Sequence, residues 1–166
     1  MRQFKIFELK DYQKILEFYK TIDQEYYPKL SERSGGLEGH IQNIINRNGN
    51  FVLFEVNNNI EGLVGFFPID KDRRVVQFTL FSFSKQYRNS FLPYRMVKYL
   101  IESRNSLGYV NTEKLIARTW YEDSANKLER VGFNKVGVVD GDIIPNRTSY
   151  YFEGNLNLII ENVLRK

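Results

Sequence analysis

A polar run at residues 85–90 joins a predicted strand directly to a predicted helix. The run reads KQYRNS and follows the alternating Phe and Ser residues of FSFS at 81–84. A helix N-terminus exposes backbone N–H donors and a partial positive charge, so it binds phosphate without needing a particular side chain. Lys85 and Arg88 add side-chain charge at the same place. We therefore expect a phosphate-binding site where this strand turns into the helix.

Residue usage excludes several kinds of chemistry. The chain of 166 residues has no cysteine, and His40 is its only histidine. Disulfides, thiolate metal sites and a cysteine nucleophile are therefore excluded, and a histidine-based zinc site or a Ser-His-Asp triad is nearly so. We expect a protein that needs no metal.

Charged residues are scattered along the chain. The 24 Lys and Arg residues exceed the 20 Asp and Glu residues, which gives a net charge of +4. This excess suits an anionic ligand, but it forms none of the basic blocks typical of nucleic-acid-binding proteins. No apolar run approaches the roughly 20 residues that span a membrane, and the N-terminus lacks the apolar core of a signal peptide. We expect a cytoplasmic protein that binds neither nucleic acid nor membrane.

Hydrophobic periodicity divides the chain into strands and helices. Helical spacing is clear at Ile15, Leu16, Tyr19 and Ile22, with Asp11 as the expected cap. Strands are predicted over residues 3–9, 50–57, 60–70, 75–84, 113–120, 133–144 and 147–156, and helices over 11–23, 37–47, 90–108 and 123–131. This order indicates a single mixed α/β domain covering residues 1–166.

The helix after the polar run connects two of these strands. A helical crossover of this kind makes the strands at 75–84 and 113–120 parallel, with a right-handed connection. The last two strands should form an antiparallel hairpin. The predicted sheet is therefore mixed.

Three stretches resemble the GNAT superfamily of N-acetyltransferases. LFSF followed by KQYR is similar to the family's fourth strand and the turn after it, with Tyr87 and Arg88 at the family's usual Tyr and Gln/Arg positions. YEDSANKLERVGF resembles the family's helix that ends in Gly-Phe, and EGLVGFF resembles its third strand. The likeness covers nearly the whole chain. It implies a GNAT-like fold, a central mixed and mostly antiparallel sheet with one parallel splayed strand pair, flanked by helices.

The resemblance also implies a site for acetyl-CoA as co-substrate. In this family the strand holds the pantetheine arm, and backbone amides of the following turn hold the pyrophosphate. Phe91 and Pro93 stand where the turn of the family has two glycines; Phe adds a side chain and Pro removes an amide donor. Ser90 is expected to cap the helix. The cofactor-binding residues implied are Phe81, Ser82, Phe83, Arg88, Asn89, Ser90, Phe91, Leu92, Tyr94 and Ser124.

The catalytic groups of the family are only partly matched. Leu128 occupies the position of the tyrosine that protonates the departing thiolate in many members, and Tyr121 replaces a frequent asparagine. Tyr121 is the nearest substitute acid, although a packing role for its ring is the alternative. A backbone N–H near Phe81–Phe83 would polarise the thioester carbonyl. The base that takes the ammonium proton is left open among Glu55, Glu122, Glu25 and Asp70.

The expected reaction is acetyl transfer to a primary amine of a small polar acceptor, such as an amino sugar or its nucleotide. Tyr26, Tyr27 and Tyr150 lie in segments that the resemblance assigns to the acceptor side. A non-catalytic protein of the same fold, binding CoA or a protein partner, is the alternative, and Phe91, Pro93 and Leu128 are the residues that favour it. A homodimer is also left open.

Overall fold

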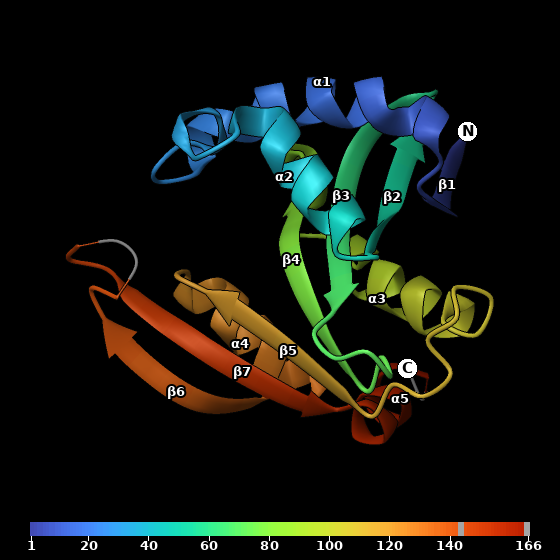
Figure 1. Cartoon of the computed structure of the whole chain (residues 1–166), viewed down its shortest axis with the longest axis vertical. Helices are drawn as coiled ribbons and strands as arrows, with labels where there is room; N and C mark the ends of the chain where they lie inside the picture. The colour runs from blue at the N-terminus through green and yellow to red at the C-terminus, as the bar shows by residue number, and fades with distance from the viewer. Residues whose placement is uncertain (143–144, 165–166) are drawn as a thin grey trace. The chain divides into compact units, whose positions relative to one another are not determined.

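The computed structural model describes residues 1–142 and 145–164. In this part of the chain the sheet has seven strands in the order β1-β2-β3-β4-β5-β7-β6 (Figure 1). The strands are β1 (Arg2–Ile6), β2 (Asn50–Val56), β3 (Asn59–Pro68), β4 (Val75–Phe83), β5 (Lys114–Thr119), β6 (Asn134–Asp140) and β7 (Thr148–Asn155). The helices are α1 (Tyr12–Ile22), α2 (Gly36–Asn46), α3 (Leu92–Ser103), α4 (Glu122–Val131) and α5 (Leu156–Leu164).

This order confirms the predicted mixed sheet and its parallel pair. β4 pairs with β5 in parallel, whereas β1 with β2, β2 with β3, β5 with β7 and β6 with β7 are antiparallel. The predicted strand at 133–144 is shorter than expected, and its last two residues, Ile143 and Ile144, lie outside the described residues. The chain consists of two compact units. Unit 1 comprises Met1–Phe67 and Leu80–Tyr99, and unit 2 comprises Pro68–Thr79 and the chain from Leu100 onward.

The core of unit 1 lies between its first two helices and the strands β2 and β3. Ile15, Leu16, Tyr19 and Ile22 of α1 are all buried, as their helical spacing predicts. They pack with Ile41 and Ile44 of α2 and with apolar residues of β2 and β3 in one cluster. This packing fixes the segment after α1 against the sheet, because Leu30 belongs to the same buried cluster.

Asp11 does not cap α1 as the sequence suggested. Its carboxylate is fully buried, accepts a hydrogen bond from the backbone N–H of Glu8 at 3.1 Å and lies 2.6 Å from the ammonium of Lys5. The side chain therefore closes the short 3-10 turn Leu9–Asp11 that precedes the helix. The lysine provides the opposite charge that a buried carboxylate needs.

Unit 2 is built on the antiparallel ladder of β5, β7 and β6, with α4 and α5 packed against these strands (Figure 1). Phe133 follows α4 and packs its ring 6.3 Å from that of Phe78 on β4. The helix α5 was not predicted. Asn155 starts it by accepting hydrogen bonds from the backbone N–H groups of Asn157 and Leu158, and Leu156, Ile159 and Val163 are buried along one face.

Candidate active site

The final part of β4 departs from regular strand geometry at Leu80. Val76 and Phe78 are buried in the first part of the strand, but in the last part the buried residue is Phe83. The buried positions therefore change from even to odd numbers, which indicates one irregular residue between them. Leu80 is that residue, because its φ of 53° lies in the left-handed region, where a bulky residue is an outlier. Such an outlier in a strand is often found at a functional site.

Parallel pairing between β4 and β5 ends before this point. The described register joins Val75 to Lys114, Val76 to Leu115 and Gln77 to Ile116. The rest of β5 continues its ladder with β7, up to the pair of Thr119 and Tyr150. The early end of the parallel register agrees with the splayed pair predicted from the sequence.

Aromatic packing fixes the end of β4 within unit 1. The ring of Phe83 lies 6.0 Å from that of Phe54 and 5.8 Å from that of Phe81. Gly62 of β3 leaves room for this ring, since a Cβ atom there would come within 2.4 Å of Phe83 Cδ1. Phe83 is buried, whereas Phe81 keeps 41% of its surface exposed. The buried ring of Phe83 therefore anchors one face of the stretch that is predicted to bind the pantetheine arm.

The turn after β4 forms the short 3-10 helix Lys85–Tyr87, and α3 begins at Leu92. Ser90 closes the turn, because its hydroxyl donates to the carbonyl of Tyr87 at 2.6 Å and accepts from the N–H of Leu92 at 3.2 Å. The hydroxyl of Ser90 therefore satisfies the first N–H of α3, although Phe91, whose carbonyl accepts from the N–H of Arg95, is the residue directly before the helix. Phe91 is 85% exposed, so its ring projects into solvent and fills no space within the turn.

Arg88 has two partners inside unit 1. Its Nε donates to the carbonyl of Phe83 at 2.6 Å, and its guanidinium forms an ion pair with the carboxylate of Glu25. Glu25 ends the 3-10 turn Asp23–Glu25 that follows α1. The arginine predicted to meet phosphate therefore also ties the end of β4 to the segment after α1. The sequence carried no signal for this ion pair, since the two residues are 63 positions apart.

A second link joins the same two segments. The hydroxyls of Tyr26 and Ser82 are hydrogen-bonded to each other. The Tyr26 ring packs against the unit 1 core, and the guanidinium of Arg33 lies 5.6 Å from its centroid. Tyr26 therefore contacts the strand predicted to hold the thioester. Tyr27 instead is 59% exposed.

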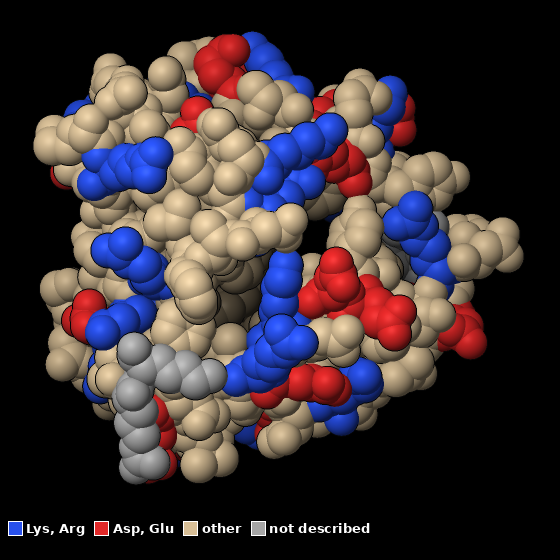
Figure 2. All heavy atoms as spheres, turned by 180° about the vertical axis from the view of Figure 1, so that it is seen from behind, with Lys and Arg blue, Asp and Glu red and all other residues tan. Residues whose placement is uncertain are grey.

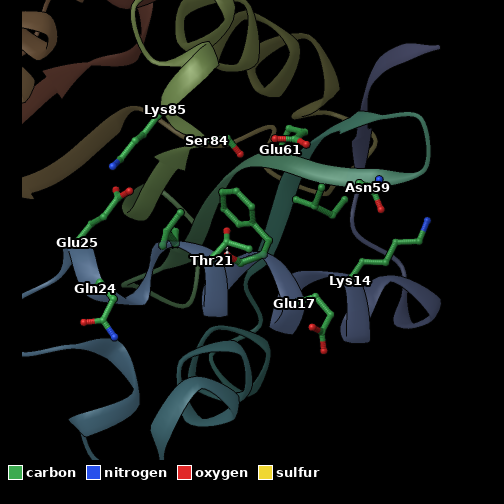
Figure 3. Close-up of a pocket in the computed structure, with 12 residues that line it drawn as sticks. Lys14, Glu17, Thr21, Gln24, Glu25, Asn59, Glu61, Ser84 and Lys85 are labelled. Carbon is green, nitrogen blue, oxygen red and sulfur yellow. Dashed lines mark hydrogen bonds between the residues drawn. The ribbon is translucent and has the colours of Figure 1, made fainter.

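A cavity of about 700 Å³ lies beside these links, within unit 1 (Figure 3). Phe18, Ile22 and Ile60 supply its apolar lining. Figure 3 shows Lys85 and Glu25 extending toward one another at one end of the cavity, with Lys14 and Asn59 at the other. The acidic lining residues are Glu17, Glu25 and Glu61, and the hydroxyls are those of Thr21 and Ser84.

Glu55, a predicted base, lies in a nearly buried ion cluster. Its carboxylate is 3.1 Å from the ammonium of Lys14, 3.3 Å from that of Lys5 and 3.0 Å from the amide of Gln3. Burial raises the pKa of Glu55, but the hydrogen bonds from Lys14, Gln3 and Lys5 outweigh it and lower the pKa below its ordinary value. A carboxylate with a lowered pKa is a poor proton acceptor. This environment suits a structural role for Glu55, and the base assignment stays a prediction.

Asp70, another candidate base, closes the turn that precedes β4. It accepts hydrogen bonds from the backbone N–H groups of Val75 at 2.8 Å and Arg74 at 3.1 Å. These bonds lower the pKa of Asp70, with that from Val75 as the main cause. The carboxylate therefore stabilises the start of β4.

The predicted site residues of unit 2 lie at the start of α4 and on β7. Tyr121 occupies the N-cap position, with 42% of its surface exposed. Its N–H donates to Thr119 Oγ1 at 3.1 Å, and its carbonyl accepts from the N–H of Ala125 at 2.9 Å. Glu122 is exposed in the first turn of α4, where its negative charge interacts favourably with the helix dipole. Ser124 is half-buried in the same turn. Tyr150 packs under the ammonium of Lys135, 5.3 Å from its ring centroid.

Charged groups of both signs are interspersed on the face shown in Figure 2. Among the described residues, no group of three or more His, Asp or Glu side chains has the arrangement of a metal site. Over the same part of the chain, no helix is long and apolar enough to cross a membrane.

No protein-family model matches the sequence, and no curated protein matches it either. Solved structures match over nearly the full length. An acetyltransferase of the GNAT family from Staphylococcus aureus Mu50 has a TM-score of 0.69 and 19% identity, with 94% of this chain and 99% of that chain covered. The acetyltransferase of the GNAT family from Streptococcus pneumoniae gives 0.73 and 17%, with 93% and 99% covered. An aminoglycoside 6'-N-acetyltransferase complexed with coenzyme A gives 0.70 and 13%, with 93% and 97% covered. The chain therefore has the fold of the GNAT acetyltransferases, as its sequence predicted.

Proposed function

We propose that this protein transfers the acetyl group of acetyl-CoA to a primary amine of a small polar acceptor. The observation that carries the proposal is the end of β4. There the parallel register stops at Gln77, Leu80 is left-handed, and the strand leads through a hydroxyl-rich turn into the N-terminus of α3. The fold shared with acetyltransferases, one of them complexed with coenzyme A, supports the proposal.

The cofactor would lie along the last residues of β4 and the turn that follows. Phe81, Ser82 and Phe83 would contact the pantetheine arm, and the residues from Arg88 to Tyr94 would contact the pyrophosphate. Exposure of the Phe91 ring supports this, because the ring leaves the backbone of the turn accessible. Pro93 supplies no N–H, so the side chains of Asn89 and Arg88 would provide donors in its place. Ser90 would join them once its hydroxyl turns from the carbonyl of Tyr87 to the phosphate. Ser124 would contact the cofactor arm, as the resemblance implies.

Three chemical tasks follow from direct attack of an amine on a thioester. A backbone N–H of Phe81–Phe83 would stabilise the negative charge that develops on the carbonyl oxygen. A carboxylate would remove the proton of the ammonium, and a phenol would protonate the sulfur. Glu122 and Glu55 were predicted for the first of these proton transfers and Tyr121 for the second. Glu25 is the candidate base that lines the cavity beside Ser84.

The acceptor would occupy that cavity. Its acidic lining residues, Glu17, Glu25 and Glu61, would attract a cationic amine, and its apolar side would pack against the carbon skeleton. Matched structures are named as acetyltransferases of aminoglycosides, phosphinothricin and spermidine. These names support a small polar amine in general. An amino sugar or its nucleotide is the particular acceptor that we propose.

Release of free thiol from acetyl-CoA tests the function directly. The purified protein would be assayed with amino sugars, an aminoglycoside and spermidine, and CoA binding would be measured by calorimetry in parallel. We expect amine-dependent thiol release together with CoA binding. CoA binding without turnover would favour the non-catalytic alternative that Leu128 and Pro93 suggest. Absence of both would contradict the proposal.

A further inference from the structure

We infer that the hydroxyl pair of Tyr26 and Ser82 delivers the proton to the departing thiolate, in the role that Leu128 cannot fill. The inference rests on the proposed acetyl transfer. Ser82 is the middle residue of the stretch Phe81–Phe83 assigned to the pantetheine arm. Its hydroxyl is already hydrogen-bonded to a phenol that comes from a segment 56 residues away along the chain.

The irregular geometry of β4 puts Ser82 on the side of the strand where Tyr26 lies. Leu80 packs against the buried cluster formed by α1, α2 and the strands β2 and β3, and Tyr26 packs against the same cluster. Ser82 follows Leu80 by two positions and therefore shares its side of the strand. Phe83, on the opposite side, contacts Phe54. Core packing, rather than a flexible surface contact, thus brings the two hydroxyls together.

The segment that carries Tyr26 is itself held in place. The N–H of Tyr26 donates to the carbonyl of Asp23 at 3.2 Å, and the buried carboxylate of Asp23 accepts from the N–H of Ser31 at 2.9 Å. Glu25, the preceding residue, is paired with Arg88, which also binds the carbonyl of Phe83. Two links therefore join the segment to β4, one at the side chain of Ser82 and one at the carbonyl of Phe83. A proton donor must be held within hydrogen-bond reach of its target, and these contacts provide that restraint.

The proton balance of the step is complete with these groups. The ammonium first loses one proton to solvent, and the neutral amine nitrogen then attacks the carbonyl carbon. The nitrogen of the tetrahedral adduct loses its second proton to solvent, and collapse of the adduct breaks the C–S bond and leaves the electron pair on sulfur. Ser82 gives its hydroxyl proton to the sulfur while the phenol of Tyr26 passes its own proton to the serine oxygen. The resulting phenolate lies beside the guanidinium of Arg33, which stabilises negative charge. It then takes up the proton that the attacking ammonium has released to solvent.

The acidities of the two groups are suited to this transfer. A phenol has an ordinary pKa of about 10 and a thiol of about 8.5, so both are protonated at neutral pH until charge develops on the sulfur. A serine hydroxyl is too weak an acid to act alone, but it relays a proton when a phenol replaces the one it gives up. The pair therefore works as a unit, and removal of either member should have the same consequence.

The kinetic test uses Tyr26→Phe, Ser82→Ala and the double variant, with Tyr12→Phe as the matched control, since Tyr12 is a half-buried tyrosine that packs against the same core. We expect kcat to fall roughly 10²-fold in each single variant, with the KM for acetyl-CoA changed less than about twofold. The double variant should be no slower than either single variant, because one relay is lost in all three. Tyr12→Phe should keep the wild-type kcat. A kcat within about twofold of wild type in Tyr26→Phe would overturn the inference.

A binding test keeps this inference separate from the proposed function. Wild-type protein should bind CoA more tightly than desulfo-CoA, which lacks the sulfur, and the preference should grow as the pH rises and the thiol ionises. Tyr26→Phe and Ser82→Ala should bind both ligands equally. If wild-type protein turned over no amine, the proposed function would fail, yet this preference would still show that the pair meets the sulfur. Equal binding of both ligands by wild-type protein would overturn the inference whatever the turnover.

Discussion

The ends of β4 and β5 are stabilised in different ways. At the end of β4, Ser82 is bonded to Tyr26, the carbonyl of Phe83 to Arg88, and the N–H of Ser84 to the carbonyl of Glu61. Past the end of β5, two hydrogen bonds of Tyr121 are local, one to Thr119 and one from Ala125. Local bonds define where a helix starts, whereas bonds from distant segments also fix side-chain direction. The links at the end of β4 therefore fix the direction of the Ser82 hydroxyl, which is what a proton donor requires.

Substitution of Gly62 should give the largest effect, because it disturbs the end of β4 directly. In Gly62→Ala the new Cβ would lie 2.4 Å from Phe83 Cδ1, and the buried Phe83 ring has neighbouring rings of Phe54 and Phe81. Overpacking at such a site should lower the free energy of unfolding by about 3 kcal/mol, as measured in urea. Thiol release should fall along with it.

The matched control lies on β6 in unit 2. A Cβ at Gly137 would meet Tyr151 Cβ at 3.6 Å, an ordinary contact. Gly137→Ala should therefore change the free energy of unfolding by less than about 0.5 kcal/mol. Equal losses in the two variants would show that the end of β4 is no more tightly packed than the ladder of unit 2.

Ion pairs give the next contrast between the units. Glu55 is nearly buried between Lys5 and Lys14, whereas the pair of Lys114 and Glu153 in unit 2 is 43% exposed on both sides, at 2.7 Å. Glu55→Gln should lower the free energy of unfolding by about 2 kcal/mol at neutral pH, since it removes charged hydrogen bonds from a buried site. Glu153→Gln should change it by less than about 0.5 kcal/mol.

The pH dependence of stability sharpens the same contrast. The folded-state pKa of Glu55 is lowered from the ordinary value of 4.5, so the unfolded chain binds more protons there in mild acid. The contribution of Glu55 is therefore complete above that value and is lost as the pH falls through the lower folded-state pKa. Urea unfolding from about pH 7 to about pH 3 should show a shallower acid decline in Glu55→Gln than in wild type. An identical decline would mean that Glu55 adds nothing to acid sensitivity.

Arg88 gives a moderate effect that separates its two roles. Arg88→Ala removes both the proposed phosphate contact and the tie to Glu25, and should weaken CoA binding about tenfold in calorimetry. Glu25→Gln keeps the arginine but removes the charge of its partner. If Arg88 meets the pyrophosphate, Glu25→Gln should keep or strengthen CoA binding. Equal weakening in both variants would show that the arginine acts only by holding the end of β4.

Local pattern predicted most of the fold, and distant contacts explain what it missed. The order of most strands and helices along the chain and the helical crossover followed from periodicity and from the turn into α3, because these signals lie within short windows. The helix α5 was missed, although Asn155 and the spacing of Leu156, Ile159 and Val163 carried its signal, because it follows β7 without a turn. The left-handed residue in β4 could not be predicted, since it is a leucine rather than a glycine.

The candidate site likewise has one part that the sequence predicts and another that depends on distant contacts. The resemblance pointed to the stretch Phe81–Phe83 and the turn after it, since their order in the sequence is local. The pairing of Tyr26 with Ser82 joins segments 56 residues apart, and that of Glu25 with Arg88 joins segments 63 residues apart. A single sequence carries no signal for such pairs, because each partner is an ordinary polar residue in its own window. The sequence therefore predicts the proton donor at Tyr121, since the family pattern marks that position.

Tyr121→Phe should give the smallest effect and is the sharpest test of the comparison. The sequence analysis predicts this phenol as the acid. If that prediction holds, removal of the hydroxyl should lower kcat roughly 10²-fold. Its side chain is 42% exposed at the N-cap of α4, and the backbone bonds that start the helix do not need its hydroxyl. If Tyr26 and Ser82 carry the proton, kcat in Tyr121→Phe should stay within about threefold of wild type, with unchanged CoA affinity. Measured beside Tyr26→Phe under one set of conditions, the two phenols should differ by more than tenfold in their effect on kcat. The reverse ranking would return the acid to the start of α4 and leave the links at the end of β4 with a structural role.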